Sequence, residues 1–181
     1  MRLSLLVGAM RHYFNVEQWV PFQIEPVFAF FADPNNLAKL MPGWQRPRIE
    51  SANYIAPVRP GDLKPIEGMA GEGSRFTFSF RPFPLSPIRL RWEAYIAEFC
   101  WNDHFCDEQI KGPFRYWRHC HRVSTQRRGD TPGVVVRDEV AYELPFDALS
   151  NQIESIFVAP QIRAMFKFRQ ARLEQQLREA L

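Results

Sequence analysis

The chain has 181 residues and a formal net charge of +3, with 46% hydrophobic and 24% charged residues. These values describe an ordinary globular protein and exclude a disordered or a membrane-spanning one. The basic residues are spread along the chain, so nucleic acid is not expected as a partner. The 16 phenylalanines and 5 tryptophans suit either a bulky core or an aromatic-lined pocket.

Residues 1–10 (MRLSLLVGAM) contain one arginine and a short apolar run. The run is too brief for a signal-peptide core with a clear cleavage site and far too brief to span a bilayer. We expect a disordered or misassigned leader, with Met10 as an alternative start and a targeting role as the other possibility. Residues 11–181 are expected to form a single domain, with no stable membrane insertion.

The cysteines Cys100, Cys106 and Cys120 form an odd set without C-x-x-C spacing. Neither a disulfide framework nor a cysteine-rich zinc site is therefore expected. A cytoplasmic location, where thiols stay reduced, fits this pattern best.

The predicted elements begin with a strand at residues 12–20, where HYFNVEQWV alternates apolar and polar positions. Two short helices follow, and Asp33 is placed to cap the second, which runs through Leu40. A possible strand at residues 48–55 precedes a long proline-rich loop at residues 56–73.

From Ser74 onward the chain alternates in a way that is typical of an antiparallel meander. The expected strands are SRFTFSF (74–80), RLRWEAYIAEF (89–99), HFCDEQI (104–110), FRYWRHCHRV (114–123) and GVVVRDEVAYEL (133–144). The tail at residues 147–181 is predicted to be helical, with Pro160 either kinking the helix or lying in the first turn of its main segment. Its expected apolar stripe consists of Ile153, Phe157, Met165, Phe166, Leu173 and Leu177, with Arg, Gln and Glu on the opposite side.

This order predicts an α+β fold in which a strongly curved antiparallel sheet of about seven strands packs around a long C-terminal helix. Two short helices come after the first strand. A bent sheet that grips one helix leaves a space between them, and this space is the default site for a small-molecule ligand.

Residue parity in the strand at 114–123 places Trp117, His119 and His121 on one face. If this face is inward, the neighbouring strands supply a matching set of residues. That set is Phe105, Asp107, Gln109, Asp138, Val140 and Tyr142, with Trp92 and Ile96 further along the sheet. The opposite face then carries Arg118, Arg122, Glu139 and Glu143 as solvated opposite charges.

Several interpretations of the histidines and carboxylates stay open. They can form a satisfied polar network that fixes strand register, or they can supply the few polar contacts that orient an apolar ligand. A histidine oriented by an aspartate can also move a proton next to a carbonyl. His-x-His with a nearby aspartate is a workable ligand set for zinc or iron, but we expect no metal and no cofactor.

The spacing FxDxQxxGPFxxWxHxH, followed by DxVxYxxP, resembles the START-like helix-grip superfamily, and within it the SRPBCC proteins often labelled cyclase/dehydrase. The resemblance covers nearly the whole chain from Met10 onward. It implies the helix-grip fold and a hydrophobic small-molecule cavity. The oxygenase branch is not expected, because the cysteine and histidine pairs of a Rieske cluster are missing.

The leading hypothesis is a noncatalytic module that binds a hydrophobic or aromatic small molecule, or a lipid-like ligand. The expected ligand-binding residues are Trp92, Ile96, Phe105, Gln109, Trp117, Asp138, Tyr142, Phe157 and Phe166. The alternative is an enzyme resembling polyketide cyclases or dehydratases, with His119 or His121 moving a proton, Asp107 or Asp138 orienting it and Tyr142 stabilising developing negative charge. That alternative fails if every histidine nitrogen is bonded to protein, and it gains support if one ring edge opens into the cavity. No partner protein is identified.

Overall fold

The computed structural model describes residues 10–145 and 150–181, so most of the expected leader lies outside the described residues. Seven antiparallel strands form one sheet with the order β1-β7-β6-β5-β4-β3-β2. The strands are β1 (Arg11–Val20), β2 (Arg48–Asn53), β3 (Arg75–Phe80), β4 (Leu90–Cys100), β5 (His104–Lys111), β6 (Tyr116–Arg128) and β7 (Thr131–Glu143). The meander from β3 to β7 and the closing pair between β1 and β7 confirm the predicted sheet.

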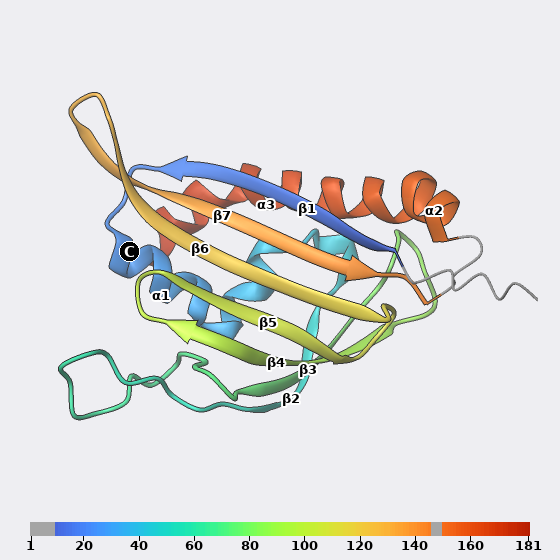
Figure 1. The fold of residues 1–181 in the computed structure, drawn as a ribbon, viewed down its shortest axis with the longest axis horizontal. Coiled ribbons are helices and arrows are strands. Elements are labelled where there is room, and N and C mark those ends of the chain that lie inside the picture. The colour runs from blue at the N-terminus through green and yellow to red at the C-terminus, as the bar shows by residue number, and fades with distance from the viewer. Residues whose placement is uncertain (1–9, 146–149) are drawn as a thin grey trace, which may run out of the picture.

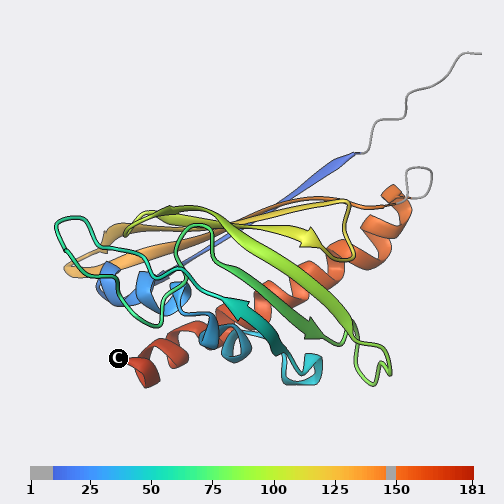
Figure 2. The ribbon, with the colours of Figure 1, turned by 90° about the horizontal axis from the view of Figure 1, so that it is seen from below.

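The helices lie on one side of this sheet (Figures 1 and 2). They are α1 (Ile24–Ala32), the 3-10 helices η1 (Pro34–Leu40) and η2 (Gly43–Gln45), α2 (Ser150–Ile153), the π-helical turn η3 (Glu154–Val158) and α3 (Ala159–Ala180). Figure 2 shows the sheet bending over α3, with α1 on the same side. This is the predicted α+β helix-grip arrangement.

Two local signals explain where helices begin. The Asp33 side chain accepts a hydrogen bond from the backbone N–H of Asn35 and so caps η1, as its position predicted. Pro160 lies in the first turn of α3, as one of the two predicted placements has it, and it directly follows the π-helical turn η3.

The apolar stripe of α3 packs against the sheet through buried residues that include Ile162, Phe166, Leu173 and Leu177. The expected continuation of the stripe to Ile153 and Phe157 is wrong, since both side chains are exposed, Phe157 by 52%. A π-helical turn has more residues per turn than an α-helix. Because Phe157 lies within η3 and Ile153 lies before it, neither side chain is in register with the stripe of α3.

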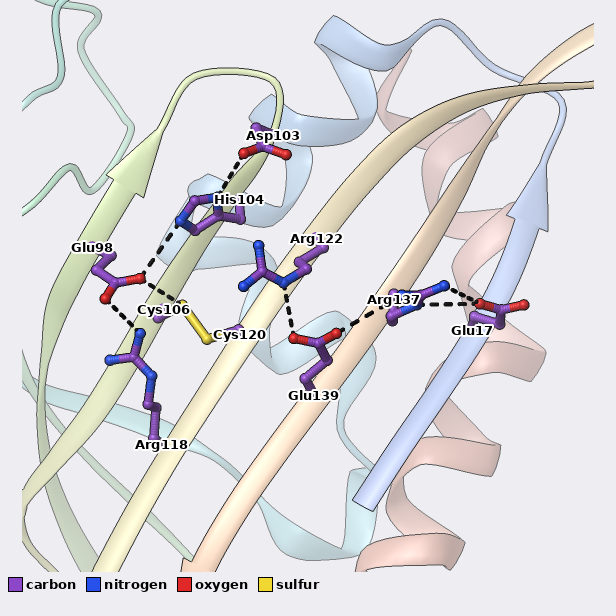
Figure 3. Close-up of polar contacts among 10 residues, drawn as sticks. All are labelled: Glu17, Glu98, Asp103, His104, Cys106, Arg118, Cys120, Arg122, Arg137 and Glu139. Carbon is purple, nitrogen blue, oxygen red and sulfur yellow. Dashed lines mark hydrogen bonds and ion pairs between the residues drawn. A yellow bond between two sulfur atoms is a disulfide. The ribbon is translucent and has the colours of Figure 1, made fainter. Parts of the chain in front are cut away.

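The face of the sheet away from α3 carries paired opposite charges, as predicted (Figure 3). Arg122 donates to Glu139 at 2.8 Å, and Arg137 lies 3.0 Å from Glu17. On the same face, Arg118 of β6 lies 2.7 Å from Glu98 of β4 and 2.6 Å from Glu108 of β5.

Cys106 and Cys120 are also on this outer face, but they form a disulfide, so the expectation of unpaired cysteines is wrong (Figure 3). The two residues lie directly opposite each other in β5 and β6, with their Cα atoms 4.0 Å apart. Cys100 is the odd cysteine and is free. An odd number of cysteines is therefore compatible with one disulfide between neighbouring strands.

Of the helices that the structure describes, none has a stretch that is both long and apolar enough to cross a membrane.

Candidate functional site

A cavity of about 170 Å³ lies between the curved sheet, α3 and the α1–η1 segment. The strands β3 to β6 supply one wall, and α3 supplies Met165, Phe166 and Arg169. The segment from Phe30 to Met41 lines the remaining side. All three sources are far apart in sequence, so the cavity exists only once the sheet has curved around the helix.

Aromatic side chains form most of the apolar wall. Phe76, Phe78 and Phe80 alternate along β3, so all three point to the same face of the sheet and into the cavity. Trp92 stacks on Phe78 with ring centroids 5.6 Å apart, and Trp117 meets Trp92 edge-on at 5.0 Å. The high aromatic content therefore serves both a core and an aromatic-lined cavity.

The polar end of the cavity is built around the buried carboxylate of Asp138. These side chains share one face of the sheet, as the parity argument predicted, and the register pairs Asp107 with His119 across β5 and β6, and His121 with Asp138 across β6 and β7. Asp138 Oδ1 lies 3.0 Å from His119 Nε2 and 2.7 Å from His121 Nδ1. Arg169 comes from α3 and places Nη1 3.6 Å from the same oxygen.

These distances fix where the protons of the histidines lie. A carboxylate oxygen only accepts, so the short contacts require His119 Nε2 and His121 Nδ1 to carry hydrogens. Arg169 Nη2 also lies 3.4 Å from His121 Nδ1, but two donors cannot bond to each other. The contact between His121 Nδ1 and Asp138 is shorter, so Nδ1 carries the hydrogen, and Nε2 is the acceptor atom of the neutral His121 ring.

Burial and charge set the protonation of this cluster. Burial, together with the charges of His119 and Arg169, lowers the pKa of His121 to about 3, so its ring is neutral at pH 7. Burial alone would raise the pKa of Asp138, but Arg169 and the two histidines outweigh it and hold that pKa well below its usual range. Burial raises the pKa of Asp107, which favours its neutral form.

Asp107, His119 and His121 bring potential metal-ligand atoms within 4.8 Å of one another. Two imidazoles whose other nitrogens contact a carboxylate resemble the support that metal-binding histidines usually have. The guanidinium of Arg169 lies beside the same rings, however, and a permanent positive charge there opposes a divalent cation. The cluster suits an acceptor group of a ligand better than a metal ion.

The structure brings most of the predicted site residues to one cavity. Those that line it are Trp92, Ile96, Phe105, Asp107, Trp117, His119, His121 and Phe166. Four others lie elsewhere for identifiable reasons. Asp138 contacts the two histidines on the side away from the cavity. Gln109 donates to the backbone oxygen of Phe114 at 2.7 Å, in the turn before β6. The Tyr142 hydroxyl donates to Glu154 at 2.7 Å, and Phe157 is exposed.

Sequence reasoning missed Arg169 and the aromatic residues of β3 and α1. Arg169 was assigned to the polar side of the helix, yet it comes three residues after Phe166 and four before Leu173. Residues with that spacing share one face of a helix, so the heptad position was a usable signal. SRFTFSF was recognised as a strand, but nothing local indicated that its phenylalanines line a cavity.

No protein-family model matches the sequence, and the search of curated proteins found no match. Solved structures do match. A protein from Thermus thermophilus aligns with a TM-score of 0.59 at 15% identity, covering 93% of this chain and 99% of its own. Norcoclaurine synthase from Thalictrum flavum aligns with a TM-score of 0.57 at 14% identity, covering 96% and 93%. The major latex-like protein 151 from Panax ginseng aligns with a TM-score of 0.57 at 10% identity, covering 92% and 97%. The sheet topology, the long C-terminal helix and these alignments together give the chain the helix-grip fold, which its sequence pattern predicted.

Proposed function

We propose that the protein binds a hydrophobic, aromatic small molecule of one or two rings in the cavity between the sheet and α3. The observation that carries this proposal is the aromatic lining of a cavity of about 170 Å³. An apolar cavity of about 150 Å³ is large enough to take up benzene. A fused two-ring molecule would reach from the aromatic wall toward Leu37, which also lines the cavity.

The fold comparison supports this size class. A second structure of norcoclaurine synthase, with a TM-score of 0.57 at 13% identity, contains dopamine and hydroxybenzaldehyde, which are both single-ring aromatic molecules. Because the two folds align over 94% of this chain, a ligand of the same size class is a reasonable occupant of the present cavity.

The proposal is tested by titrating the protein with 1-aminonaphthalene, a neutral two-ring probe whose fluorescence changes in apolar surroundings. We expect saturable binding with a Kd on the order of 1–100 µM, since a ligand of this size contributes roughly 0.5 kcal/mol per heavy atom. Leu37 lines the cavity, so Leu37→Trp puts a larger ring at its wall and should abolish the signal. Leu63→Trp is the matched control, because Leu63 is 99% exposed and lies outside the cavity lining. Equal binding by both variants would place the probe elsewhere and refute the proposal.

A second candidate is an acid–base enzyme that moves a proton next to a carbonyl group, as cyclisation or dehydration requires. The supporting observation is that His121 lines the cavity and that Nε2, the acceptor atom of its ring, has no hydrogen-bond partner among the described residues. A pKa of about 3 makes this nitrogen a weak base, which favours the binding proposal. Deuterium exchange at the carbon between the ring and the carbonyl of 2-tetralone tests the candidate. Exchange above the buffer rate that disappears in His121→Gln would support it, and exchange at the buffer rate would reject it.

The cytoplasmic location stays a prediction, and the disulfide argues against it, because stable disulfides are rare in that compartment. Alkylation of the protein in freshly lysed cells, followed by mass measurement, counts its free thiols. Three free thiols would favour the cytoplasm, whereas one would favour an oxidising compartment.

A further inference from the structure

We propose that the polar end of the cavity binds a carboxylate group of the ligand through the guanidinium of Arg169, so that the preferred ligand is an aromatic acid. This inference rests on the proposed small-molecule binding and specifies which chemical class the site selects.

Arg169 is placed as a fixed cation at the boundary between the apolar and polar parts of the cavity. Its side chain is 14% exposed and lines the cavity from α3. The guanidinium carbon lies 5.0 Å from the ring centre of Phe31 and 5.7 Å from that of Phe166. These rings hold the guanidinium by cation–π contact without satisfying its N–H groups.

The hydrogen-bonding capacity of Arg169 is almost unused. A guanidinium has five N–H donors. Among the described residues, the polar contacts of Arg169 are Nη1 to Asp138 at 3.6 Å and Nη2 to His121 at 3.4 Å, while Nε has none. The first is too long for a good hydrogen bond, and the second faces a nitrogen that is itself a donor. Buried donors are usually paired, so this guanidinium lacks an acceptor that a ligand could supply.

A carboxylate matches these donors better than a neutral group does. Its two oxygens can accept two parallel N–H bonds from one guanidinium, which is the strongest geometry available to arginine. Asp138 cannot play this role fully, because the same Oδ1 atom already lies within 3.0 Å of His119 and 2.7 Å of His121.

The carboxyl groups of the protein near this position do not exclude an added anion. Burial raises the pKa of Asp107, so this carboxyl takes up a proton more readily than an ordinary aspartate does when an anion enters the cavity. Asp33 also lines the cavity, but its Oδ1 atom accepts from Asn35 at 2.9 Å as part of the η1 cap. Asp138 lies behind the histidines rather than in the lining.

The test compares 2-naphthoate with 2-naphthamide by isothermal titration calorimetry. The two molecules have the same ring system and nearly the same size, but 2-naphthoate carries an anionic carboxylate where 2-naphthamide carries a neutral amide. We expect the wild-type protein to bind the acid about 10–100-fold more tightly, as charge-assisted hydrogen bonds allow. Arg169→Gln should reduce this ratio to about 1 while leaving the affinity for the amide within about threefold. Arg169→Lys keeps the charge but loses the two-pronged donor, so it should give an intermediate ratio.

Arg172→Gln is the matched control, because Arg172 is an exposed arginine on the same helix that contacts Gln175. It should leave the ratio unchanged. Equal wild-type affinity for acid and amide would overturn the carboxylate inference while leaving the proposed binding function intact. Failure of the protein to bind either compound would overturn both. Binding of the amide by each variant shows that the variant is folded, and the wild-type ratio decides the question even if one variant does not fold.

Discussion

Replacing Asp138 with asparagine tests the polar cluster most directly, because the substitution removes a charge with almost no change in shape. The carboxylate of Asp138 is 7% exposed and contacts three donor groups, from His119, His121 and Arg169. Asparagine can still accept through its carbonyl oxygen, but it leaves the guanidinium of Arg169 without a counter-charge. We therefore expect Asp138→Asn to fold with clearly reduced stability.

The size of the effect follows from these contacts. A hydrogen bond to a charged group contributes about 1.5–3 kcal/mol, against about 1 kcal/mol for a neutral one, so the two histidine contacts lose roughly 1–4 kcal/mol together. Removing one partner of a buried ion pair costs about 3–5 kcal/mol in total. We expect the free energy of unfolding at pH 7 to fall by about 3–5 kcal/mol, a large part of the stability of a typical domain.

Urea unfolding followed by circular dichroism measures this change. Glu139→Gln is the matched control, because it removes a carboxylate from the next residue of β7 on the outer face. Its pair with Arg122 is partly exposed and should contribute at most about 1 kcal/mol. In the double variant Asp138→Asn/Arg169→Gln, the two losses should not add, because both remove the same ion pair. A loss below about 1 kcal/mol for Asp138→Asn would show that the carboxylate is not a buried partner of these donors, and it would refute the reasoning.

Three further predictions concern pH, the disulfide and the core. The pKa of His121 is lowered to about 3 in the folded protein. As the pH falls below about 6.5, this histidine therefore becomes protonated in the unfolded chain but stays neutral in the folded protein. The free energy of unfolding should fall by about 1.4 kcal/mol per pH unit more in the wild type than in His121→Gln. Identical slopes from urea unfolding between about pH 6 and 4 would contradict this. Cys106→Ser should lower stability by about 3 kcal/mol, since the bond spans a sequence separation of 14, whereas Cys100→Ser should have no effect; equal unfolding midpoints would argue that the disulfide does not form. Phe166→Ala removes a side chain that is 1% exposed and should cost about 3–5 kcal/mol, and a loss near zero would mean that α3 does not pack there.

The sheet and the facing of its side chains could be predicted because alternation with a period of two is a local signal. The shared face of Asp107, His119, His121 and Asp138 followed from strand order and parity alone, whereas their exact pairing came from the structure. The same register places Cys106 opposite Cys120. The disulfide was therefore within reach of the sequence, and it was missed because the argument used cysteine count and spacing rather than strand register.

The other misses arise where tertiary structure overrides a local pattern. Arg169 lies in a run of charged and polar residues, and an isolated arginine on a helix is usually solvated. It faces inward because Asp138, from a distant strand, supplies a counter-charge under α3. Phe157 was assigned to the cavity from α-helical spacing, which the π-helical turn interrupts. The spacing of Arg169 from Phe166 and Leu173 did indicate the inward face of the helix, but neither the distant counter-charge nor the irregular turn has a local sequence signature.

The central claim, that aromatic molecules bind in this cavity, is tested most directly by recording the tryptophan indole N–H signals in a nitrogen–proton NMR spectrum while adding naphthalene. Trp92 and Trp117 line the cavity, whereas Trp19 donates its indole N–H to the backbone oxygen of Gln126 and lies outside the cavity lining. The account predicts saturable shifts of the Trp92 and Trp117 signals, with the Trp19 signal unchanged. Unchanged Trp92 and Trp117 signals at saturating naphthalene, or shifts confined to Trp19, would contradict it.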